Sequence, residues 1–174
     1  GAKILNPSKK VLLPDMKAGC SLEFSCPPPQ FKAFREANPE HIAITYINCS
    51  AEIKALTDII VTSSNAEAII NSLPRDQKII FAPDKFLGSY LNKKTGRDML
   101  LWDGSCMVHE RFSERELIKL KVAHPKAKII AHPECPEALL NYADYIGSTS
   151  GLLKYTEQHA GNEFLVLTEA SILH

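Results

Sequence analysis

The sequence lacks several features that mark special classes of protein. No apolar run approaches the roughly 18 residues that cross a membrane, and the N-terminus does not read as a secretory signal. The 20 basic and 20 acidic residues leave a formal net charge of zero, so charge favours neither nucleic acid nor an anionic membrane as a partner. The five cysteines are scattered rather than grouped as a disulfide framework, which indicates a reducing, cytoplasmic setting.

What is present is typical of a globular α/β protein. The chain has 174 residues, enough for one ordinary domain or two small ones, and 45% of them are hydrophobic. Short apolar segments alternate with segments of helical periodicity, which indicates short parallel sheets covered by helices on both faces. The predicted strands are residues 11–13, 41–47, 58–62, 78–82, 127–131, 145–147 and 164–167. The predicted helices are residues 31–37, 51–56, 65–73, 113–123, 136–142 and 150–159, with one more opening at Asp84.

The chain also repeats itself at an offset of 86 residues. Identical residues in register are Cys20 and Cys106 (106 − 20 = 86), Ala37 and Ala123, Pro39 and Pro125, Ile44 and Ile130, Cys49 and Cys135, Asp58 and Asp144, and Ser64 and Ser150. At the end of each copy, residues 81–88 (FAPDKFLG) align with residues 167–174 (LTEASILH) at the same offset. The fold class expected is therefore two tandem homologous three-layer α/β/α units.

The repeat divides the chain into three segments. Residues 1–15 are expected to be the tail of a preceding unit with a connecting strand, because AKILN (residues 2–6) resembles DKFLG and ASILH. The first unit spans residues 16–102 and the second spans residues 103–174. We therefore expect the chain to be a piece of a longer protein; the alternative is that residues 2–10 form an ordinary N-terminal helix.

Polar side chains gather where the predicted strands end. Tyr46 and Asn48 end a strand of the first unit, and His132 and Glu134 occupy the same places in the second. An imidazole beside a carboxylate suits acid–base chemistry. Two hydroxyl-rich turns, residues 62–65 and 148–151, precede helices; they can bind an anion with hydroxyl and backbone N–H groups or simply cap the helices, and the pattern leaves both interpretations open.

The cysteines differ in the roles that their positions suggest. Cys20 and Cys106 hold the same place at the start of each unit, so they are candidates for two of three equivalent metal ligands. Cys49 and Cys135 follow apolar strands and are expected to be structural. Cys26 forms C-x5-C with Cys20, which is a weak metal spacing. Spacing alone does not separate an iron–sulfur cluster from a zinc site that uses Cys106 and His109.

Several long strings resemble those of the quinolinate synthase family over nearly the whole chain. They are VLLPDMKAGCSLE, TYINCSAEIKALTD, TSSNA, WDGSCMVHE, AHPECPEALLNYADYIGSTSG and FLVLTEASILH. The resemblance implies three pseudo-equivalent α/β/α units around a 4Fe–4S cluster held by one cysteine from each. It also implies condensation of iminoaspartate with dihydroxyacetone phosphate to quinolinate in de novo NAD biosynthesis, with L-aspartate oxidase as the upstream supplier.

The resemblance further implies roles for individual residues. Cys20 and Cys106 match two cluster ligands, and the matched catalytic residues are Glu134, His132 and Tyr46. The matched substrate contacts are Tyr46, Asn48, Ser63, His109, His132, Glu134, Ser148 and Thr149. The family's N-terminal unit and third cluster cysteine are missing here, so we expect this chain alone to hold the cluster poorly and to be inactive.

Two other functions fit the same residues. A duplicated anion-binding module would use the two hydroxyl-rich turns without catalysis. A zinc-dependent hydrolase would use Cys106, His109 and His132.

Overall fold

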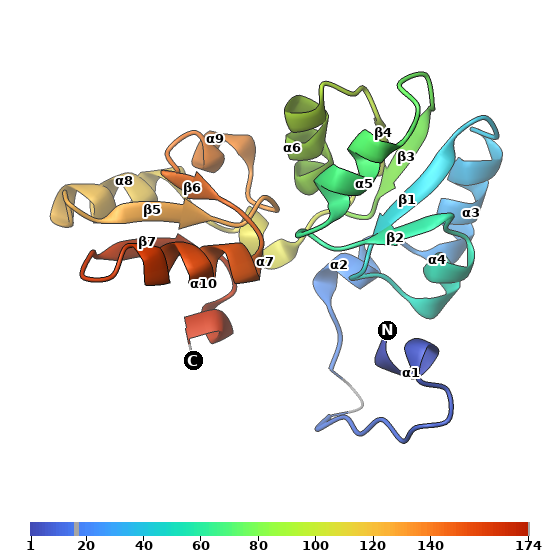
Figure 1. Ribbon diagram of the computed structural model, residues 1–174, viewed down its shortest axis with the longest axis horizontal. Helices are drawn as coiled ribbons and strands as arrows, with labels where there is room; N and C mark the ends of the chain where they lie inside the picture. The colour runs from blue at the N-terminus through green and yellow to red at the C-terminus, as the bar shows by residue number, and fades with distance from the viewer. Residues whose placement is uncertain (16–17, 174) are drawn as a thin grey trace.

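The structure is a computed structural model that describes residues 1–15 and 18–173 (Figure 1). Its strands are β1 (Ile42–Tyr46), β2 (Ile59–Val61), β3 (Ile79–Ala82), β4 (Leu100–Leu101), β5 (Lys128–Ala131), β6 (Tyr145–Ile146) and β7 (Phe164–Leu167). Its helices are α1 (Ala2–Leu5), α2 (Ser21–Phe24), α3 (Pro28–Glu36), α4 (Ala51–Ala55), α5 (Ala66–Ser72), α6 (Lys85–Thr95), α7 (Met107–Glu110), α8 (Glu114–Ala123), α9 (Glu137–Leu140), α10 (Thr149–Gln158) and the 3₁₀ helix η1 (Ala170–Leu173). No helix in this described part is both long and apolar enough to cross a membrane.

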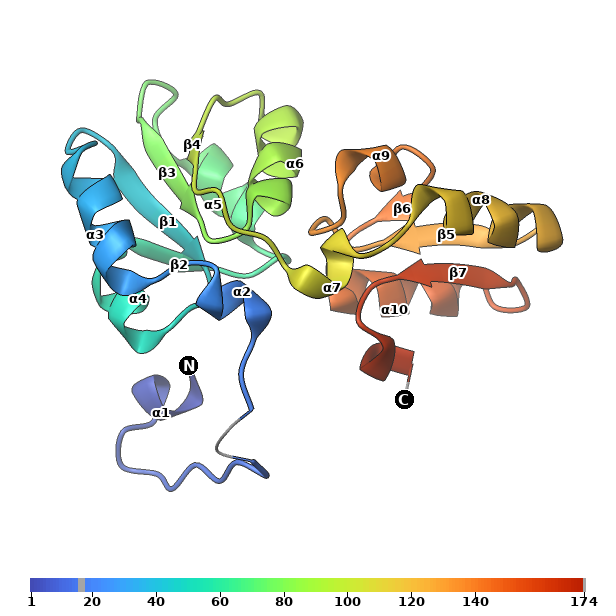
Figure 2. The ribbon, with the colours of Figure 1, turned by 180° about the vertical axis from the view of Figure 1, so that it is seen from behind.

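The first sheet has four parallel strands in the order β2-β1-β3-β4. The chain moves from β1 to β2 in one direction and from β2 back across β1 to β3 in the other. Because parallel crossovers are right-handed, α4 and α5 must lie on opposite faces of the sheet. Figure 2 shows this arrangement, with α3 and α4 on one face and α5 and α6 on the other.

Alternating side chains of this sheet pack into two separate hydrophobic cores, one on each face. Ile44 of β1 and Phe81 of β3 pack with apolar residues of α5 and α6. Ala43 and Ile80, one position earlier on the same strands, pack with Phe31 of α3 and its neighbours. Side chains alternate between the faces of a strand, so a strand covered on both faces must be largely apolar. IIFA is wholly apolar, and IAITY contains one buried threonine, Thr45, whose hydroxyl bonds to that of Thr57.

The second sheet has three parallel strands in the order β6-β5-β7. Leu117 of α8 and Leu139 of α9 pack with Ile129, Ala131 and Leu167 of the sheet. The direction of the crossovers places α10 on the other face, where its Leu152 is buried. The two sheets lie side by side, and α7 lies between them (Figures 1 and 2).

Most of the predicted elements are confirmed within a residue or two at each end. Three predictions are wrong: the strand at residues 11–13, the caps of α5, and the offset of the repeat at the end of each copy. Residues 11–13 form no strand, because they pair with no other strand among the described residues and their side chains are exposed. Ser63 and Ser64 do not cap α5; the residue before this helix is Asn65, whose Oδ1 accepts from the backbone N–H of Thr62 at 2.7 Å. The predicted boundary at residue 16 lies outside the described residues.

The third wrong prediction is the offset of 86 at the end of each copy. Ile42 pairs with Ile79, and Lys128, 86 positions later, pairs with Phe164 instead of residue 165. The last strand of the second sheet therefore lies 85 positions after that of the first (164 − 79 = 85). The connection before β7 is one residue shorter than the one before β3.

Candidate functional site

A cleft of about 340 Å³ opens where the carboxyl ends of the two sheets approach each other. In α/β proteins this edge carries the loops that bind ligands. The lining residues are Gly19, Cys20, Ser21, Tyr46, Asn48, Cys106, Val108, His109, His132, Glu134, Thr149, Thr168 and Glu169. The structure thus brings together eight of the ten predicted site residues; Ser63 and Ser148 are the two that do not line the cleft.

The candidate acid–base residues lie at the ends of two strands. Tyr46 is the last residue of β1, and His132 directly follows β5. The backbone N–H of His132 donates to Leu167 at 3.0 Å, which continues the strand pairing for one more residue and fixes where the loop begins. His132 and Glu134 are each only 3% exposed. Their burial is unusual for polar residues and places them inside the cleft wall rather than in solvent.

Two short helices deliver the cysteines. Cys20 precedes α2 and Cys106 precedes α7, and neither four-residue helix was predicted. The two helices touch, because the backbone N–H of Met107 donates to Ser21 Oγ at 3.2 Å. Cys20 and Cys106 therefore line one cleft, each directly before a four-residue helix.

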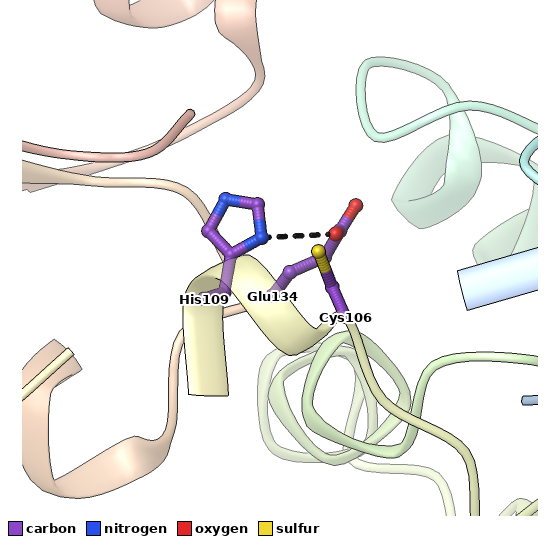
Figure 3. A group of neighbouring side chains, drawn as sticks. All are labelled: Cys106, His109 and Glu134. Carbon is purple, nitrogen blue, oxygen red and sulfur yellow. Dashed lines mark ion pairs between the residues drawn. The ribbon is translucent and has the colours of Figure 1, made fainter. Parts of the chain in front are cut away.

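Figure 3 shows three side chains that point toward one another: Cys106 directly before α7, His109 from α7, and Glu134 from the loop after β5. Their ligand atoms all lie within 4.8 Å of one another, and all three residues are buried. His109 Nδ1 lies 3.2 Å from Glu134 Oε2, yet this nitrogen makes no hydrogen bond with good geometry. His109 Nε2 lies 3.1 Å from Thr168 Oγ1. Sulfur, nitrogen and oxygen donors in this arrangement suit a metal of intermediate softness.

The ligand group differs from the set named for a zinc hydrolase. His132 contacts Glu134 rather than the thiol: its Nδ1 lies 3.7 Å from Glu134 Oε1, and its ring stacks on that of His109 at 5.2 Å between centroids. Among the described residues, Glu134 therefore takes the place beside Cys106 and His109 that His132 was expected to hold.

The pKa values of His109 and His132 are shifted in opposite directions. Burial lowers the pKa of His109, but its polar contacts with Cys106 and Glu134 and their negative charges outweigh burial and raise the pKa to about 9. Burial lowers the pKa of His132 to about 4, since the charge of Glu134 compensates only in part. At neutral pH His109 is therefore a cation and His132 is a neutral imidazole.

Glu134 and Tyr46 form the other half of this network. Burial raises the pKa of Glu134, but its contact with His109, electrostatic interactions with His132 and His109, and a hydrogen bond from Tyr46 bring it below its usual range. Burial and the nearby charge of Glu134 raise the pKa of Tyr46. Glu134 is thus a carboxylate and Tyr46 a neutral hydroxyl that donates to it. Ser63 is also hydrogen-bonded to Tyr46, so it reaches the site indirectly.

The two hydroxyl-rich turns behave differently. Ser148 caps α10 by accepting from the backbone N–H of Gly151 at 3.2 Å, while Thr149 lines the cleft. In the first turn, Thr62 Oγ1 lies 2.9 Å from Ser64 Oγ, so these hydroxyls bond to each other. Capping therefore accounts for Ser148, and Thr149 is the hydroxyl that faces the cleft.

The remaining cysteines lie outside the cleft lining. Cys26, Cys49 and Cys135 are buried in the cores of the two units. Burial raises the pKa of Cys26 and of Cys135 to about 12, which keeps both thiols protonated and unreactive.

Four polar residues at the site were not predicted as site residues: Ser21, Asp84, Thr168 and Glu169. Asp84, which is fully buried, accepts from the backbone N–H of Leu87 at 2.7 Å and from that of Cys106 at 3.1 Å. Burial raises its pKa to about 7. Asp84 was predicted only to open α6; the signal for its second role was the turn before Cys106, which a parallel bridge from Asp84 to Gly104 holds in place. Thr168 and Glu169 directly follow β7, so the same strand-end position that indicated Tyr46 and His132 was the signal for them.

Comparison with known proteins gives a consistent result. The family model described as Quinolinate synthetase A protein matches residues 1–174. Proteins named quinolinate synthase from Synechocystis sp. and Microcystis aeruginosa are each 61% identical over 173 residues, and one from Trichormus variabilis is 58% identical. These alignments cover 99% of this chain and 53–54% of each relative, so the chain spans about half the length of the curated relatives it matches. A match over every residue of the chain places it in the quinolinate synthase family.

Proposed function

We propose that this chain supplies one wall of the active centre of a quinolinate synthase, which condenses iminoaspartate with dihydroxyacetone phosphate and releases phosphate and water. The observation that carries the proposal is the cleft in which two equivalent cysteines, two histidines and a buried carboxylate converge. The names of the relatives supply the reaction.

The donor set fits a soft or intermediate metal centre. His109 Nδ1 is buried and without a well-formed hydrogen bond, as expected for an atom beside a ligand-binding space. We propose that Cys20 and Cys106 are two ligands of a 4Fe–4S cluster whose third cysteine lies outside this chain. When bound, the cluster supplies a Lewis-acidic iron open to the substrate.

The side chains of the chain handle protons and charge. Glu134, a carboxylate in contact with His109 and Tyr46, can take a proton from the substrate and return it during imine–enamine exchange and dehydration. The neutral His132 ring beside it can relay that proton. Asn48, Thr149 and the cationic His109 offer donors for the substrate carboxylates and phosphate, with Ser63 and Ser148 supporting the neighbouring turns.

The chain's two sheets support a duplicated architecture. Both have the strand order that results from the same two crossovers, β2-β1-β3 and β6-β5-β7. The helices that follow Cys20 and Cys106 have the same length and the same place. We propose that residues 16–102 and 103–174 are homologous α/β/α units, that residues 1–15 belong to a preceding unit, and that the complete enzyme has three such units.

The test is metal and activity analysis in parallel. A full-length quinolinate synthase, prepared without oxygen, should contain iron and sulfide and form quinolinate from the two substrates. Serine at the position of Cys20 or Cys106 should abolish the iron–sulfur absorption, whereas serine at Cys49 or Cys135, which lie in the cores, should preserve it. The 174-residue chain alone should hold the cluster poorly and show no turnover.

Other outcomes would point elsewhere. Stoichiometric zinc without sulfide would favour a zinc enzyme built on Cys106, His109 and Glu134. Binding of phosphate without metal or turnover would favour the anion-binding module. L-aspartate oxidase is the proposed supplier of iminoaspartate, by analogy with the family.

A further inference from the structure

The second unit carries an apolar groove of about 290 Å³ that shares no lining residue with the cleft. It is lined by Phe112, Ser113, Glu116, Leu117, Leu120, Leu139, Phe164, Leu165, Val166 and Leu167, which belong to α8, α9, β7 and the residues just before α8. Leu120 is 48% exposed. A cluster of large apolar side chains open to solvent indicates a surface that another segment covers.

Strand β7 also has an open edge. It lies at the end of the order β6-β5-β7, and within residues 1–15 and 18–173 no strand pairs with its outer side. Three of its four residues are only partly buried, whereas all four residues of the corresponding β3 are buried. The difference arises because β3 pairs with β4 on its outer side, through Ile80 with Leu100 and Phe81 with Leu101.

In the first unit, the place of the groove is filled. Five residues of the first unit are equivalent to groove residues of the second. They lie in or against one core, together with Leu100 and Trp102. The five pairs are Cys26 with Phe112, Phe31 with Leu117, Phe34 with Leu120, Ile53 with Leu139 and, at the offset of 85, Ile80 with Leu165.

Trp102 is the side chain that closes that core. Its ring meets Phe31 at 5.9 Å and Phe34 at 5.3 Å between centroids, both edge to face. Its backbone N–H donates to Phe81 at 2.9 Å, and its indole Nε1 donates to the carbonyl of Ser25 at 2.9 Å. One strand and one aromatic ring therefore suffice to cover this face.

We propose that the groove receives a parallel strand from the part of the quinolinate synthase polypeptide that this chain does not span, with an aromatic side chain seated between Leu117 and Leu120. The strand pairs with Leu165 and Val166 as β4 pairs with Ile80 and Phe81. The relatives are nearly twice as long as the match, so their polypeptides contain residues to supply it. The inference rests on the proposed duplication and not on the proposed reaction.

Hydrogen exchange with mass spectrometry tests the proposal without measuring catalysis. We compare the 174-residue chain with the full-length Synechocystis quinolinate synthase and follow the peptides that cover β7 and β3. The β7 amides should exchange at least about tenfold more slowly in the full-length protein, because a strand edge becomes paired. The ratio at β3, which β4 covers in both proteins, should stay near one.

Two results would overturn the proposal. Equal exchange at β7 in both proteins would mean that the edge stays open. Protection that grows with protein concentration would mean that a second copy covers the groove. A matched pair of variants gives an independent reading: Leu120→Asp should lower the Tm when placed at the aligned position of the full-length protein but barely change the Tm of this chain. Val122→Asp, which is 76% exposed and lies outside the groove, should change neither.

Discussion

Glu134 is the residue on which the contacts of the cleft converge. It meets His109 at 3.2 Å and His132 at 3.7 Å, and it accepts a hydrogen bond from Tyr46. A carboxylate that is 3% exposed needs such partners, because an unpaired buried charge is strongly unfavourable. The same partners that make its burial tolerable also hold it at the position where a substrate proton would be exchanged.

Replacing Glu134 by Gln in the full-length enzyme should therefore remove proton transfer while preserving shape. We expect kcat for quinolinate formation to fall by about 10²- to 10⁴-fold, the usual contribution of general acid–base catalysis. Iron content should be unchanged. Glu137→Gln, at a surface ion pair with Lys93, is the control and should retain full activity. Retention of kcat in Glu134→Gln would exclude Glu134 as the base.

Asp84 joins two segments through backbone hydrogen bonds. Its carboxylate caps α6 and accepts from the backbone N–H of Cys106, so Asp84→Ala removes a cap and leaves a buried N–H unpaired. We expect a loss of about 2–4 kcal/mol in the free energy of unfolding, measured by urea denaturation of the chain. Asp103→Ala removes only the exposed ion pair with Lys85 and should cost less than about 1 kcal/mol. Similar losses in both variants would contradict this.

At the scale of elements, two equivalent aspartates fix the starts of strands. Asp58 Oδ2 accepts from the backbone N–H of Ala43 at 2.7 Å, and Asp144 Oδ2 accepts from that of Ile129 at 2.9 Å. Arg35 and Lys128 add ion pairs. Burial raises the pKa of each carboxyl, but these bonds outweigh it and hold both pKa values below the usual 3.8.

The sign of the pH dependence follows from that direction. A lowered folded-state pKa means that the ionised form stabilises the fold, so its contribution is complete well above pH 3.8 and is lost as the pH falls through the folded-state pKa. As the pH falls from 5 to 2, the free energy of unfolding should therefore decrease less in the double variant Asp58→Asn/Asp144→Asn than in the wild type. The free energy of unfolding is measured by urea denaturation at each pH. An equal decrease in the two proteins would contradict the prediction.

Sequence patterns predicted the elements that have length and partners. IAITY and IIFA are largely apolar because both of their faces are covered. Ser50, Ser113 and Ser148 precede helices, and their hydroxyls accept hydrogen bonds from backbone N–H groups of those helices. The two residues of β4 and the four residues of α2 and α7 are too short to show a period. Residues 11–13 have strand-like composition but no partner strand in the described structure, so composition misled.

The site was predictable to a similar degree. The repeat and the family strings identified Cys20, Cys106, His132 and Glu134, because strand ends and equivalent positions are visible in sequence. The contact of His109 with Glu134 was not visible, since it joins α7 to a loop 25 residues later (134 − 109 = 25) through the packing of the second unit. Asp84 was not predicted as a site residue because its partner there is a backbone N–H, and only the turn before Cys106 indicated this contact.

At the scale of the whole molecule, Tyr90 links the cores of the two sheets, which are the two proposed units. It lies on α6 and packs against the cores of both. The nearby ion pair of Lys93 with Glu137 also joins α6 to α9, but its side chains are 61% and 56% exposed. An exposed pair contributes little, so the aromatic contact should dominate the coupling of the units.

Tyr90→Ala should therefore loosen the link between the units. We expect a loss of about 1–2 kcal/mol, less than for a fully buried aromatic, and a thermal transition that broadens or splits in calorimetry. Lys93→Ala should leave a single transition with a change below about 0.5 kcal/mol. A single sharp transition in Tyr90→Ala would show that the units are coupled by other contacts.

The change of offset from 86 to 85 before β7 has a consequence for the history of the chain. On the proposed duplication, one copy has lost or gained a residue in the connection between a helix and the following strand, at the edge opposite the cleft. The strand did not slip, because a slip of one residue would have turned its core side chains outward. Selection has thus kept the inward pattern of Leu165 and Leu167 and left the length of that connection free. Insertions and deletions among natural variants should accumulate there and be rare at the cleft edge.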